Sequence, residues 1–377
     1  MAKVVIMGAR AKEMIIFRGD LILDLVAAGH EVYSLAGEGD EMMKERIESL
    51  GAKFISYPIM RNQVNVVKDL ETVSYLKKII GQIAPDVVLA YNIKPVIWGS
   101  FAVDKSKSVK YYALIEGLGF AFYQGGFKRA LLRLVAVLLY RLAMYKTDQA
   151  IFLNKDNLDV FIKEKIVPAR KCSMVDGIGV DLEHFRQVPV TSSPFVFLTI
   201  ARLLGEKGLR EYFEAACIVK KKYPEVQFNI LGQFDTSHDG IPEAEVDMWR
   251  ASGAMNYLGT AEDVRPYLEK ASVYVLPSYH EGLPRSTQEA MSMGRPVLTT
   301  DVPGCRQTVE NGENGFMVEV KNVDALVERM FWFIEHPDML GHMGAKSREI
   351  AEARFDVKKI NAKIIGMMGL QQGVRPH

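Results

Sequence analysis

Short apolar runs alternate with longer amphipathic stretches along most of the chain. Residues 4–7 are a continuous apolar run of strand length, and the run 86–90 is apolar after its first residue, Asp86; residues 17–28 and 64–83 repeat apolar side chains at helical spacing. Continuous apolar strands separated by helices are typical of a parallel sheet that helices cover on both faces. The pattern therefore predicts an α/β fold built on parallel sheets.

This alternation breaks at residues 186–194, RQVPVTSSP, where two prolines, two serines and a threonine indicate a linker. It restarts with strands expected at residues 195–200, 226–231 and 273–276. We therefore predict two doubly wound, Rossmann-like domains at residues 1–187 and 188–354, with a C-terminal helical segment, 355–377, that packs back on the first. Ligands of such sheets lie beyond the carboxyl ends of the strands, so a cleft between the two facing domains is the expected site.

Composition narrows the class of protein. The 377 residues are 49% hydrophobic and 25% charged, which excludes a disordered chain. Lys and Arg number 47 against 46 Asp and Glu, so no global basic excess favours nucleic acid as a partner. Three distant cysteines favour a reducing compartment over a disulfide framework or a zinc ribbon. The longest apolar run, residues 134–140, is far below the ~20 residues that span a bilayer, and no signal-peptide core is found.

Two glutamates bracket a loop and the helix after it. Glu281 is expected in the loop and Glu289 in the helix, eight positions on. Eight helical residues rise ~12 Å, so these carboxylates are too far apart for the ~5–5.5 Å pair of a retaining glycosidase. The backbone N–H groups of residues 282–286 lie at the helix N-terminus, where an anion is stabilised. Two solvated glutamates on a surface loop are the plain alternative.

Two cations follow the first strand of the second predicted domain. Arg202 and Lys207 are five residues apart, with Gly205 between them and Gly208 after them. This spacing suits a turn that presents both cations to a diphosphate. One charge pair at ~4 Å and an effective dielectric near 20 gives ~4 kcal/mol, enough to stabilise a leaving group that gains negative charge. A solvated loop is again the alternative.

Three motifs occur in order between residues 177 and 289: GIGVDLEHF (177–185), ARLLGEKG (201–208) and EGLPRSTQE (281–289). Together they resemble the family 4 retaining glycosyltransferases, whose fold is GT-B. The first half, through YNIKPVIWGS (91–100) and ALIEGLG (113–119), resembles the branch that builds bacterial capsule, O-antigen and protein-linked glycans. The resemblance implies transfer of N-acetylgalactosamine, or another N-acetylhexosamine, from a UDP-sugar to an undecaprenyl-diphosphate-linked saccharide.

The resemblance also assigns roles to residues. Arg202 and Lys207 would hold the donor diphosphate, Glu281 would face the donor sugar, and Glu289 would accept hydrogen bonds from the ribose hydroxyls. The other expected donor contacts are Gly232, Tyr257, Leu258, Gly282, Leu283 and Pro284. No D-x-D motif occurs, so neither a bridging metal ion nor a cofactor is expected. Retention is expected to proceed by front-face attack without an enzymic nucleophile, so that positioning and leaving-group stabilisation carry the reaction.

The first half offers candidates for the acceptor. Lys94 and Glu116 lie in family-like motifs, whereas Arg18 and Arg61 are chosen by their position near predicted loops. Each would grip the acceptor diphosphate or sugar, or would be a member of a structural ion pair. Gly8 is followed by Ala9 where many relatives have a second glycine, which weakens the expectation that this loop approaches a donor phosphate.

A basic and apolar stretch lies beside these candidates. No acidic residue occurs from 117 to 147, and Lys128, Arg129 and Arg133 accompany the apolar residues of 131–145. Such a helix can lie in the lipid headgroup layer, where each cation contributes ~1 kcal/mol; an ordinary buried helix is the alternative. The expected partners are thus a nucleotide-sugar donor, a lipid-linked saccharide acceptor and an anionic membrane surface. We expect a cytoplasmic protein, peripheral on the inner face of the cell membrane.

Three other functions fit the same pattern. A nucleotide-sugar epimerase and a phosphorylase can be built on the same two-domain architecture. A non-catalytic sugar-nucleotide-binding subunit of a polysaccharide assembly complex would need the donor site alone.

Overall fold

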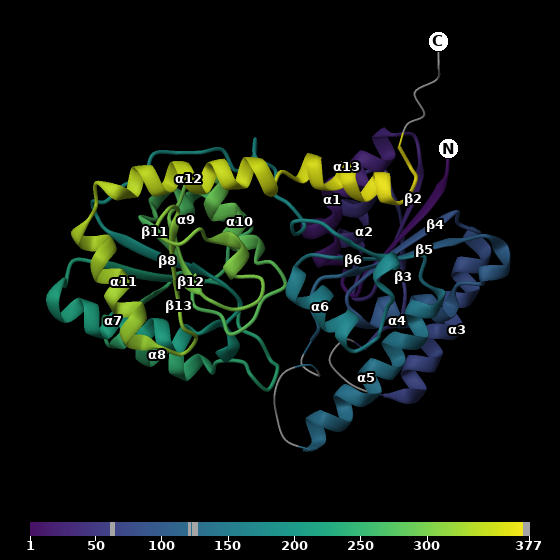
Figure 1. The fold of residues 1–377 in the computed structure, drawn as a ribbon, viewed down its shortest axis with the longest axis horizontal. Coiled ribbons are helices and arrows are strands. Elements are labelled where there is room, and N and C mark those ends of the chain that lie inside the picture. The colour runs from purple at the N-terminus through teal and green to yellow at the C-terminus, as the bar shows by residue number, and fades with distance from the viewer. Residues whose placement is uncertain (61–64, 120–121, 123–126, 372–377) are drawn as a thin grey trace, which may run out of the picture. The chain divides into compact units, whose positions relative to one another are not determined.

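The computed structural model describes residues 1–60, 65–119, 122 and 127–371. For residues 127–129 it describes the backbone alone. Contacts divide the chain into two compact units (Figure 1). The first comprises Met1–Ile178 together with the C-terminal segment from Lys358 onward, and the second comprises Gly179–Val357. Each unit is a doubly wound α/β sheet, which confirms the predicted fold class.

The first unit is built on a parallel sheet with the strand order β3-β2-β1-β4-β5-β6-β7. Its strands are β1 (Lys3–Met7), β2 (Glu31–Ala36), β3 (Lys53–Ser56), β4 (Val87–Tyr91), β5 (Lys110–Ile115), β6 (Gln149–Phe152) and β7 (Cys172–Met174). All five residues of β4 are buried, because helices cover both faces of the sheet centre. Because β1, β4 and β5 are neighbouring parallel strands, their carboxyl ends lie side by side along one edge of the sheet, the edge at which the strands end.

Helices of the first unit form two layers. They are α1 (Ala11–Ala27), α2 (Glu41–Glu48), α3 (Val66–Ile83), α4 (Ile93–Ala102), α5 (Phe127–Lys146), α6 (Lys155–Lys163) and α13 (Val357–Met367). Figure 1 shows α3, α4 and α5 together on one face of the sheet and α1 with α13 on the other. Leu76 of α3, Val96 of α4 and Tyr140 of α5 share one core with Val88 of β4.

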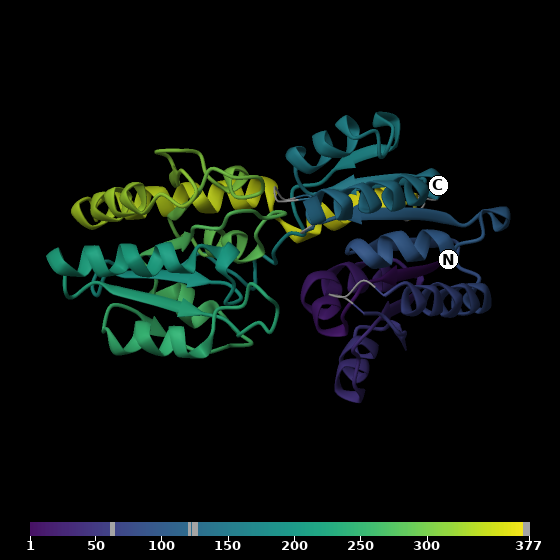
Figure 2. The same ribbon diagram turned by 90° about the horizontal axis from the view of Figure 1, so that it is seen from below.

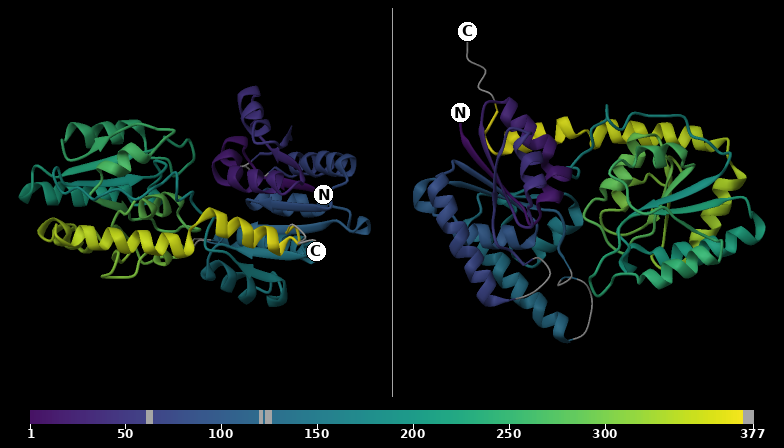
Figure 3. Two further views of the ribbon diagram at one scale, coloured as in Figure 1. Left: turned by 90° about the horizontal axis from the view of Figure 1, so that it is seen from above. Right: turned by 180° about the vertical axis from the view of Figure 1, so that it is seen from behind.

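The C-terminal helix α13 packs against the first unit (Figure 3). Asn361 Nδ2 donates a hydrogen bond to Asp24 Oδ2 of α1 at 2.8 Å. The carbonyl oxygen of Leu370 lies 3.0 Å from His30 Nε2. Residues 372–377 of the predicted C-terminal segment lie outside the described residues.

The second unit has a parallel sheet with the strand order β10-β9-β8-β11-β12-β13. Figure 2 shows helices above and below this sheet. Its strands are β8 (Val196–Ile200), β9 (Gln227–Leu231), β10 (Asn256–Tyr257), β11 (Val273–Leu276), β12 (Val297–Thr300) and β13 (Gly315–Val318). Its helices are α7 (Leu209–Lys222), α8 (Glu243–Ala251), α9 (Arg265–Lys270), α10 (Arg285–Ser292), α11 (Val323–Glu335) and α12 (Met339–Arg354). Phe197 and Phe228 fill the core on one face, and Leu198 and Tyr274 fill the core on the other.

The boundary between the units is earlier than the sequence predicted. The second unit begins at Gly179, not after residue 187. Val180 and Phe185 pack in the same core as Leu198 of β8. Arg348 of α12 donates to the carbonyl oxygen of Phe185 at 3.0 Å. The segment from 179 to 187 therefore belongs to the second unit because its apolar side chains are buried there.

Candidate active site

The two predicted cations and the loop glutamate are placed by neighbouring strands. Arg202 follows β8, Lys207 ends a short 3₁₀ turn, and Glu281 lies between β11 and α10; β8 and β11 are paired and parallel. Gly208 has φ +68°, and a Cβ there would lie 2.0 Å from the carbonyl oxygen of Pro277. Glycine at this position therefore lets the turn that carries Lys207 pack directly on the loop after β11.

Lys207 and Glu281 form an ion pair. Lys207 Nζ lies 2.6 Å from Glu281 Oε1, and the two side chains are 13% and 15% exposed. Ser278 donates to the same carboxylate oxygen at 2.8 Å. The N–H of Tyr279 also donates to the carbonyl oxygen of Glu206 at 2.8 Å, which ties the two loops together. The structure thus joins two residues that the sequence singled out in separate motifs.

Arg202 has an acidic partner that the sequence did not indicate. Its Nη1 lies 2.7 Å from Asp235 Oδ2 in the loop after β9. Although burial opposes the shift, hydrogen bonds from Ser237 and the charge of Arg202 lower the pKa of Asp235. Asp235 is therefore ionised and neutralises Arg202. Both candidate diphosphate-binding cations are held by carboxylates.

The loop before α10 is held from two sides. Gly304 has φ +82°, and a Cβ there would lie 2.5 Å from the carbonyl oxygen of Glu281 and 2.6 Å from that of Gly282. The N–H of Glu281 donates to the carbonyl oxygen of Pro303 at 3.2 Å. Leu283 is buried, and Pro284 precedes the first residue of α10. These contacts hold the loop that contains the predicted residues Gly282, Leu283 and Pro284 directly before the N-terminus of α10. A helix N-terminus stabilises a bound anion.

Glu289 lies one helical turn after Arg285 on α10. Arg285 Nε donates to Glu289 Oε1 at 2.8 Å, and both side chains are largely buried. Burial raises the pKa of Glu289, and the charge of Arg285 opposes that shift. The sequence did not single out Arg285, although its position four residues before Glu289 is a known spacing for helical ion pairs.

The remaining predicted donor residues gather at the ends of β9 and β10. The N–H of Gly232 donates to the carbonyl oxygen of Gly259 at 2.8 Å, and Tyr257 Oη donates to the carbonyl oxygen of Gly232 at 2.9 Å. The N–H of Leu258 donates to the carbonyl oxygen of Ile230 at 2.8 Å. A Cβ on Gly232 would lie 1.8 Å from the carbonyl oxygen of Ala201, so packing alone requires glycine here.

In the first unit, two of the four acceptor candidates meet. Arg18 of α1 pairs with Glu116, which directly follows β5. Arg18 is 2% exposed, and its guanidinium is paired with Glu116, which fits the alternative that Arg18 is a member of a structural ion pair. Lys94 lies in a separate pair, with its Nζ 2.7 Å from Asp69 Oδ1, and this contact joins α4 to α3. Arg61 lies outside the described residues.

Helix α5 carries two apolar faces. Val137, Tyr140 and Met144 are buried in the core, as an ordinary packed helix would have them. A second set of large apolar side chains is exposed to solvent: Leu131, Leu134, Val135, Leu138, Leu142 and Tyr145. We call this set the α5 apolar stripe. Arg133, beside it, lies 2.5 Å from Glu164 Oε1. Lys128 and Arg129 belong to the first turn of α5, but their side chains lie outside the described part of the structure.

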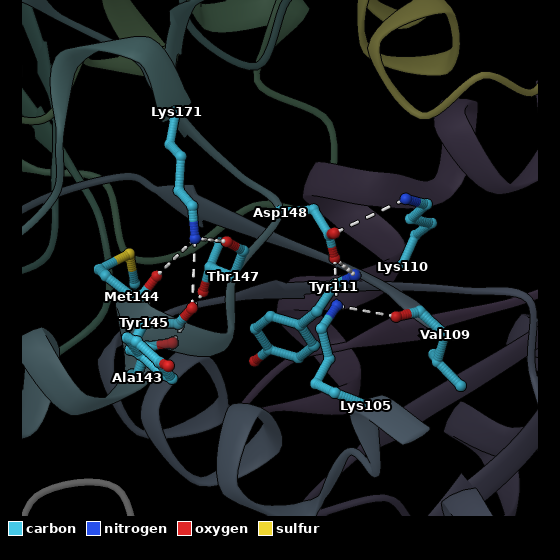
Figure 4. Close-up of polar contacts among 10 residues, drawn as sticks. All are labelled: Lys105, Val109, Lys110, Tyr111, Ala143, Met144, Tyr145, Thr147, Asp148 and Lys171. Carbon is cyan, nitrogen blue, oxygen red and sulfur yellow. Dashed lines mark hydrogen bonds and ion pairs between the residues drawn. The ribbon is translucent and has the colours of Figure 1, made fainter. Parts of the chain in front are cut away.

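The C-terminal end of α5 is fixed by charge (Figure 4). Lys171 Nζ donates to the carbonyl oxygens of Met144, Tyr145 and Thr147. A cation at a helix C-terminus satisfies carbonyl groups that have no partner within the helix. Asp148, the next residue, accepts from the N–H of Tyr111 at 2.7 Å and so anchors the chain to β5. These charges fix the C-terminal end of α5 beside the beginning of β5.

Within the described ranges, no group of three or more His, Cys, Asp or Glu side chains is arranged to hold a metal ion. In the same residues, no helix combines the length and the apolar character that crossing a membrane requires.

Comparison with known proteins gives matches along both units. Residues 13–154 match the family model for glycosyl transferase 4-like domains, and residues 181–350 match that for glycosyl transferases group 1. The chain is 30% identical over 333 residues to the N,N'-diacetylbacillosaminyl-diphospho-undecaprenol alpha-1,3-N-acetylgalactosaminyltransferase of Campylobacter jejuni, covering 85% of this chain and 86% of that protein. It is 26% identical to the UDP-Gal:alpha-D-GlcNAc-diphosphoundecaprenol alpha-1,3-galactosyltransferase of Escherichia coli, covering 75% and 74% of the two chains.

Solved structures match the whole chain. The sucrose-phosphate synthase of Thermosynechococcus elongatus superimposes with a TM-score of 0.80 at 17% identity, covering 97% of this chain and 98% of that one. HepE of Anabaena, solved in complex with UDP and glucose, superimposes with a TM-score of 0.79 at 18% identity, covering 98% and 100%. These matches confirm the expected GT-B fold.

Proposed function

The chain belongs to the group 1 glycosyl transferases, and we propose that it transfers N-acetylgalactosamine, or another N-acetylhexosamine, from a UDP-sugar to an undecaprenyl-diphosphate-linked saccharide with retention of anomeric configuration. The observation that carries this proposal is the contact of Lys207 with Glu281 beside the N-terminus of α10. It joins a cation suited to a diphosphate with a carboxylate suited to a sugar. The names of the Campylobacter and Escherichia relatives support the donor and acceptor classes.

In this proposal Lys207 and Arg202 bind the donor diphosphate. Each exchanges its carboxylate partner, Glu281 or Asp235, for phosphate oxygens. As the bond from the anomeric carbon to the diphosphate oxygen breaks, that oxygen gains negative charge. Cations already fixed in a partly buried site stabilise this charge more than water does.

The two glutamates bind different hydroxyl groups of the donor. Glu281, released in part from Lys207, accepts hydrogen bonds from hydroxyls of the transferred sugar. Glu289 accepts them from the ribose, and Arg285 keeps its carboxylate oriented at 2.8 Å. Ser278 Oγ donates to Glu281 Oε1 at 2.8 Å, and this hydrogen bond, which does not depend on Lys207, makes the carboxylate a poorer nucleophile. This supports attack by the acceptor hydroxyl on the same face from which UDP leaves.

The α5 apolar stripe is proposed to contact the lipid surface that carries the acceptor. Leu134 is 66% exposed and Leu138 is 56% exposed, and Arg133 borders them. Apolar side chains flanked by cations lie in the headgroup layer of anionic membranes, and each cation there contributes ~1 kcal/mol. On this basis the protein acts at the cytoplasmic face of the cell membrane, bound to it peripherally.

A panel of nucleotide sugars tests the proposal. The purified chain is first screened by thermal shift with UDP, UDP-N-acetylgalactosamine, UDP-N-acetylglucosamine, UDP-galactose and a GDP-sugar. Transfer from each donor to a synthetic polyprenyl-diphosphate-linked saccharide is then measured. We expect stabilisation by UDP compounds and transfer from a UDP-N-acetylhexosamine. Binding without transfer would indicate a non-catalytic subunit, interconversion of free UDP-sugars would indicate an epimerase, and no response to any UDP compound would overturn the donor assignment.

A further inference from the structure

Three adjacent strands of the first unit end around one carboxylate. Glu116 directly follows β5, Asn92 directly follows β4, and Ala9 lies two residues after β1. β4 lies between β1 and β5 in the sheet, so these residues share the edge at which doubly wound sheets bind ligands. Arg18 of α1 completes the group.

Both oxygens of Glu116 are held. Arg18 Nη2 donates to Oε1, and Asn92 Nδ2 donates to Oε2 at 2.8 Å. Asn92 is itself held, because its Oδ1 accepts from the N–H of Ala9 at 3.0 Å. The guanidinium of Arg18 lies 4.7 Å from the ring centroid of Tyr91, which fixes its plane. The carboxylate is therefore oriented directly by Arg18 and Asn92, and indirectly by Ala9, which holds Asn92.

Burial separates the roles of the two charges. Arg18 is 2% exposed, whereas Glu116 is 22% exposed at the strand edge. A ligand at this edge meets the carboxylate and does not meet the guanidinium. Asn92 has φ +63° and ψ 155°, an unfavourable backbone conformation for a residue other than glycine. Strain of this kind persists where the surrounding structure holds a functional geometry.

The exposed chemistry of this group selects its ligand. The positive charge of Arg18 offsets the negative charge of Glu116. The oxygens of an ionised carboxylate accept hydrogen bonds but donate none. A diphosphate offers acceptors and negative charge, so it is disfavoured here; a sugar offers hydroxyl donors. We infer that Glu116 binds a hydroxyl group of the acceptor saccharide, and that Arg18 and Asn92 are positioning residues for its carboxylate. This inference rests on the proposed function, and it assigns the sugar, not the diphosphate, to this edge of the first unit.

Two variants test the role of the carboxylate. Glu116→Gln removes its charge, and Asn92→Gly removes its second hydrogen bond at a φ that glycine adopts freely. Because a hydrogen bond to a charged group is worth about 1.5–3 kcal/mol, we expect about a 10- to 100-fold loss in kcat/KM for the acceptor. The UDP dissociation constant should stay within about twofold of wild type, because the proposed donor site lies in the second unit. Glu31→Gln, which removes another paired carboxylate of the same unit, is the matched control and should leave transfer unchanged.

The double variant Arg18→Met with Glu116→Met separates binding from structure. Removing one member of a buried ion pair destabilises the fold, whereas replacing both with apolar groups of similar size restores stability. We expect its melting temperature to return toward wild type while transfer stays as low as in Glu116→Gln. Recovery of transfer together with stability would overturn the inference, since it would make the pair structural.

Acceptors with and without the diphosphate complete the test. The Glu116→Gln variant should lose the same factor on a polyprenyl-diphosphate-linked saccharide and on the same saccharide carried by a neutral lipid. A loss confined to the diphosphate acceptor would overturn the assignment of this edge to the sugar. If the wild-type chain transfers no sugar at all, the proposed function fails; if it transfers and Glu116→Gln transfers equally well, the inference alone fails.

Discussion

Lys207 and Glu281 are 74 residues apart in the sequence, yet Lys207 Nζ lies 2.6 Å from Glu281 Oε1. Two neighbouring parallel strands, β8 and β11, end at the same edge and bring the loops that follow them together. The pair joins the two motifs on which the donor site depends. Predictions about the donor site therefore begin here.

Replacing Lys207 with Ala should reduce transfer by about 10²- to 10³-fold, as loss of a group that stabilises developing charge does elsewhere. The fold should survive at a lowered melting temperature, because Glu281 loses its partner but the hydrogen bond from the N–H of Tyr279 to the carbonyl oxygen of Glu206 still joins the two loops. Transfer and thermal unfolding measure the two effects. Lys222→Ala, which removes an exposed lysine 2.7 Å from Glu335, is the matched control. Full activity in Lys207→Ala would remove the proposed role.

Asp235 competes with the donor for Arg202. The Asp235→Asn variant keeps the shape of the side chain but removes its charge, so Arg202 becomes available to phosphate. Because Arg202 is partly exposed, its pair with Asp235 is worth about 0–1 kcal/mol, and the UDP dissociation constant should fall by up to about fivefold. Isothermal titration calorimetry with UDP measures this. Weaker binding would mean instead that Asp235 organises Arg202 for the donor.

Glu289 should make both stability and UDP binding depend on pH. Burial raises its pKa above the ordinary 4.5, so the folded protein holds the proton more tightly than the unfolded chain does. Its contribution to stability is then fully present below pH 4.5 and is lost as pH rises through the raised pKa. UDP binding should become tighter as pH rises through the same range, since the ionised carboxylate is the better acceptor for ribose hydroxyls.

The Glu289→Gln variant is the control for that prediction. Melting temperatures and UDP dissociation constants of both proteins, measured from pH 4 to 8, should differ in their pH dependence across this window. Parallel curves would show that Glu289 does not titrate as stated. A variant that binds UDP as well as wild type at every pH would remove Glu289 from the donor site.

The α5 apolar stripe should bind membranes. Leu134→Glu and Leu138→Glu should each lower binding to vesicles that contain phosphatidylglycerol by about 10-fold, because a charge replaces an apolar contact in the headgroup layer. Their melting temperatures should stay near wild type, since both side chains are exposed. Met248→Glu, at an exposed apolar position of α8 in the second unit, should bind vesicles as wild type does. Equal binding by all three variants would exclude the stripe as the membrane contact.

Strand positions followed closely from the apolar runs. The runs at 4–7 and 86–90 correspond to Lys3–Met7 and Val87–Tyr91, because central strands of a parallel sheet are buried on both faces. The first residues of helices were predicted less accurately from the sequence. The helix expected at 17–28 is Ala11–Ala27, and its N-cap, Arg10, makes no side-chain capping bond that the sequence would signal.

The chemistry of the site was predictable where it is local and was missed where it depends on which loops meet. Arg202, Lys207 and Glu281 each lie in a short motif, but Asp235 lies in a loop without periodicity and pairs with Arg202 only through the fold. Arg18 shows the same limit. Arginine is seldom fully buried, so sequence favours a surface role, whereas the sheet edge encloses it against Glu116.

The measurement that tests the central claim most directly is the structure of the product. The purified chain is incubated with UDP-N-acetylgalactosamine and a synthetic polyprenyl-diphosphate-linked saccharide, and the product is examined by NMR while released UDP is quantified. The account predicts one UDP released for each sugar transferred, and an α-glycosidic product that keeps the configuration of the donor. A β-linked product, or donor that remains unconsumed while the acceptor is present, would contradict it.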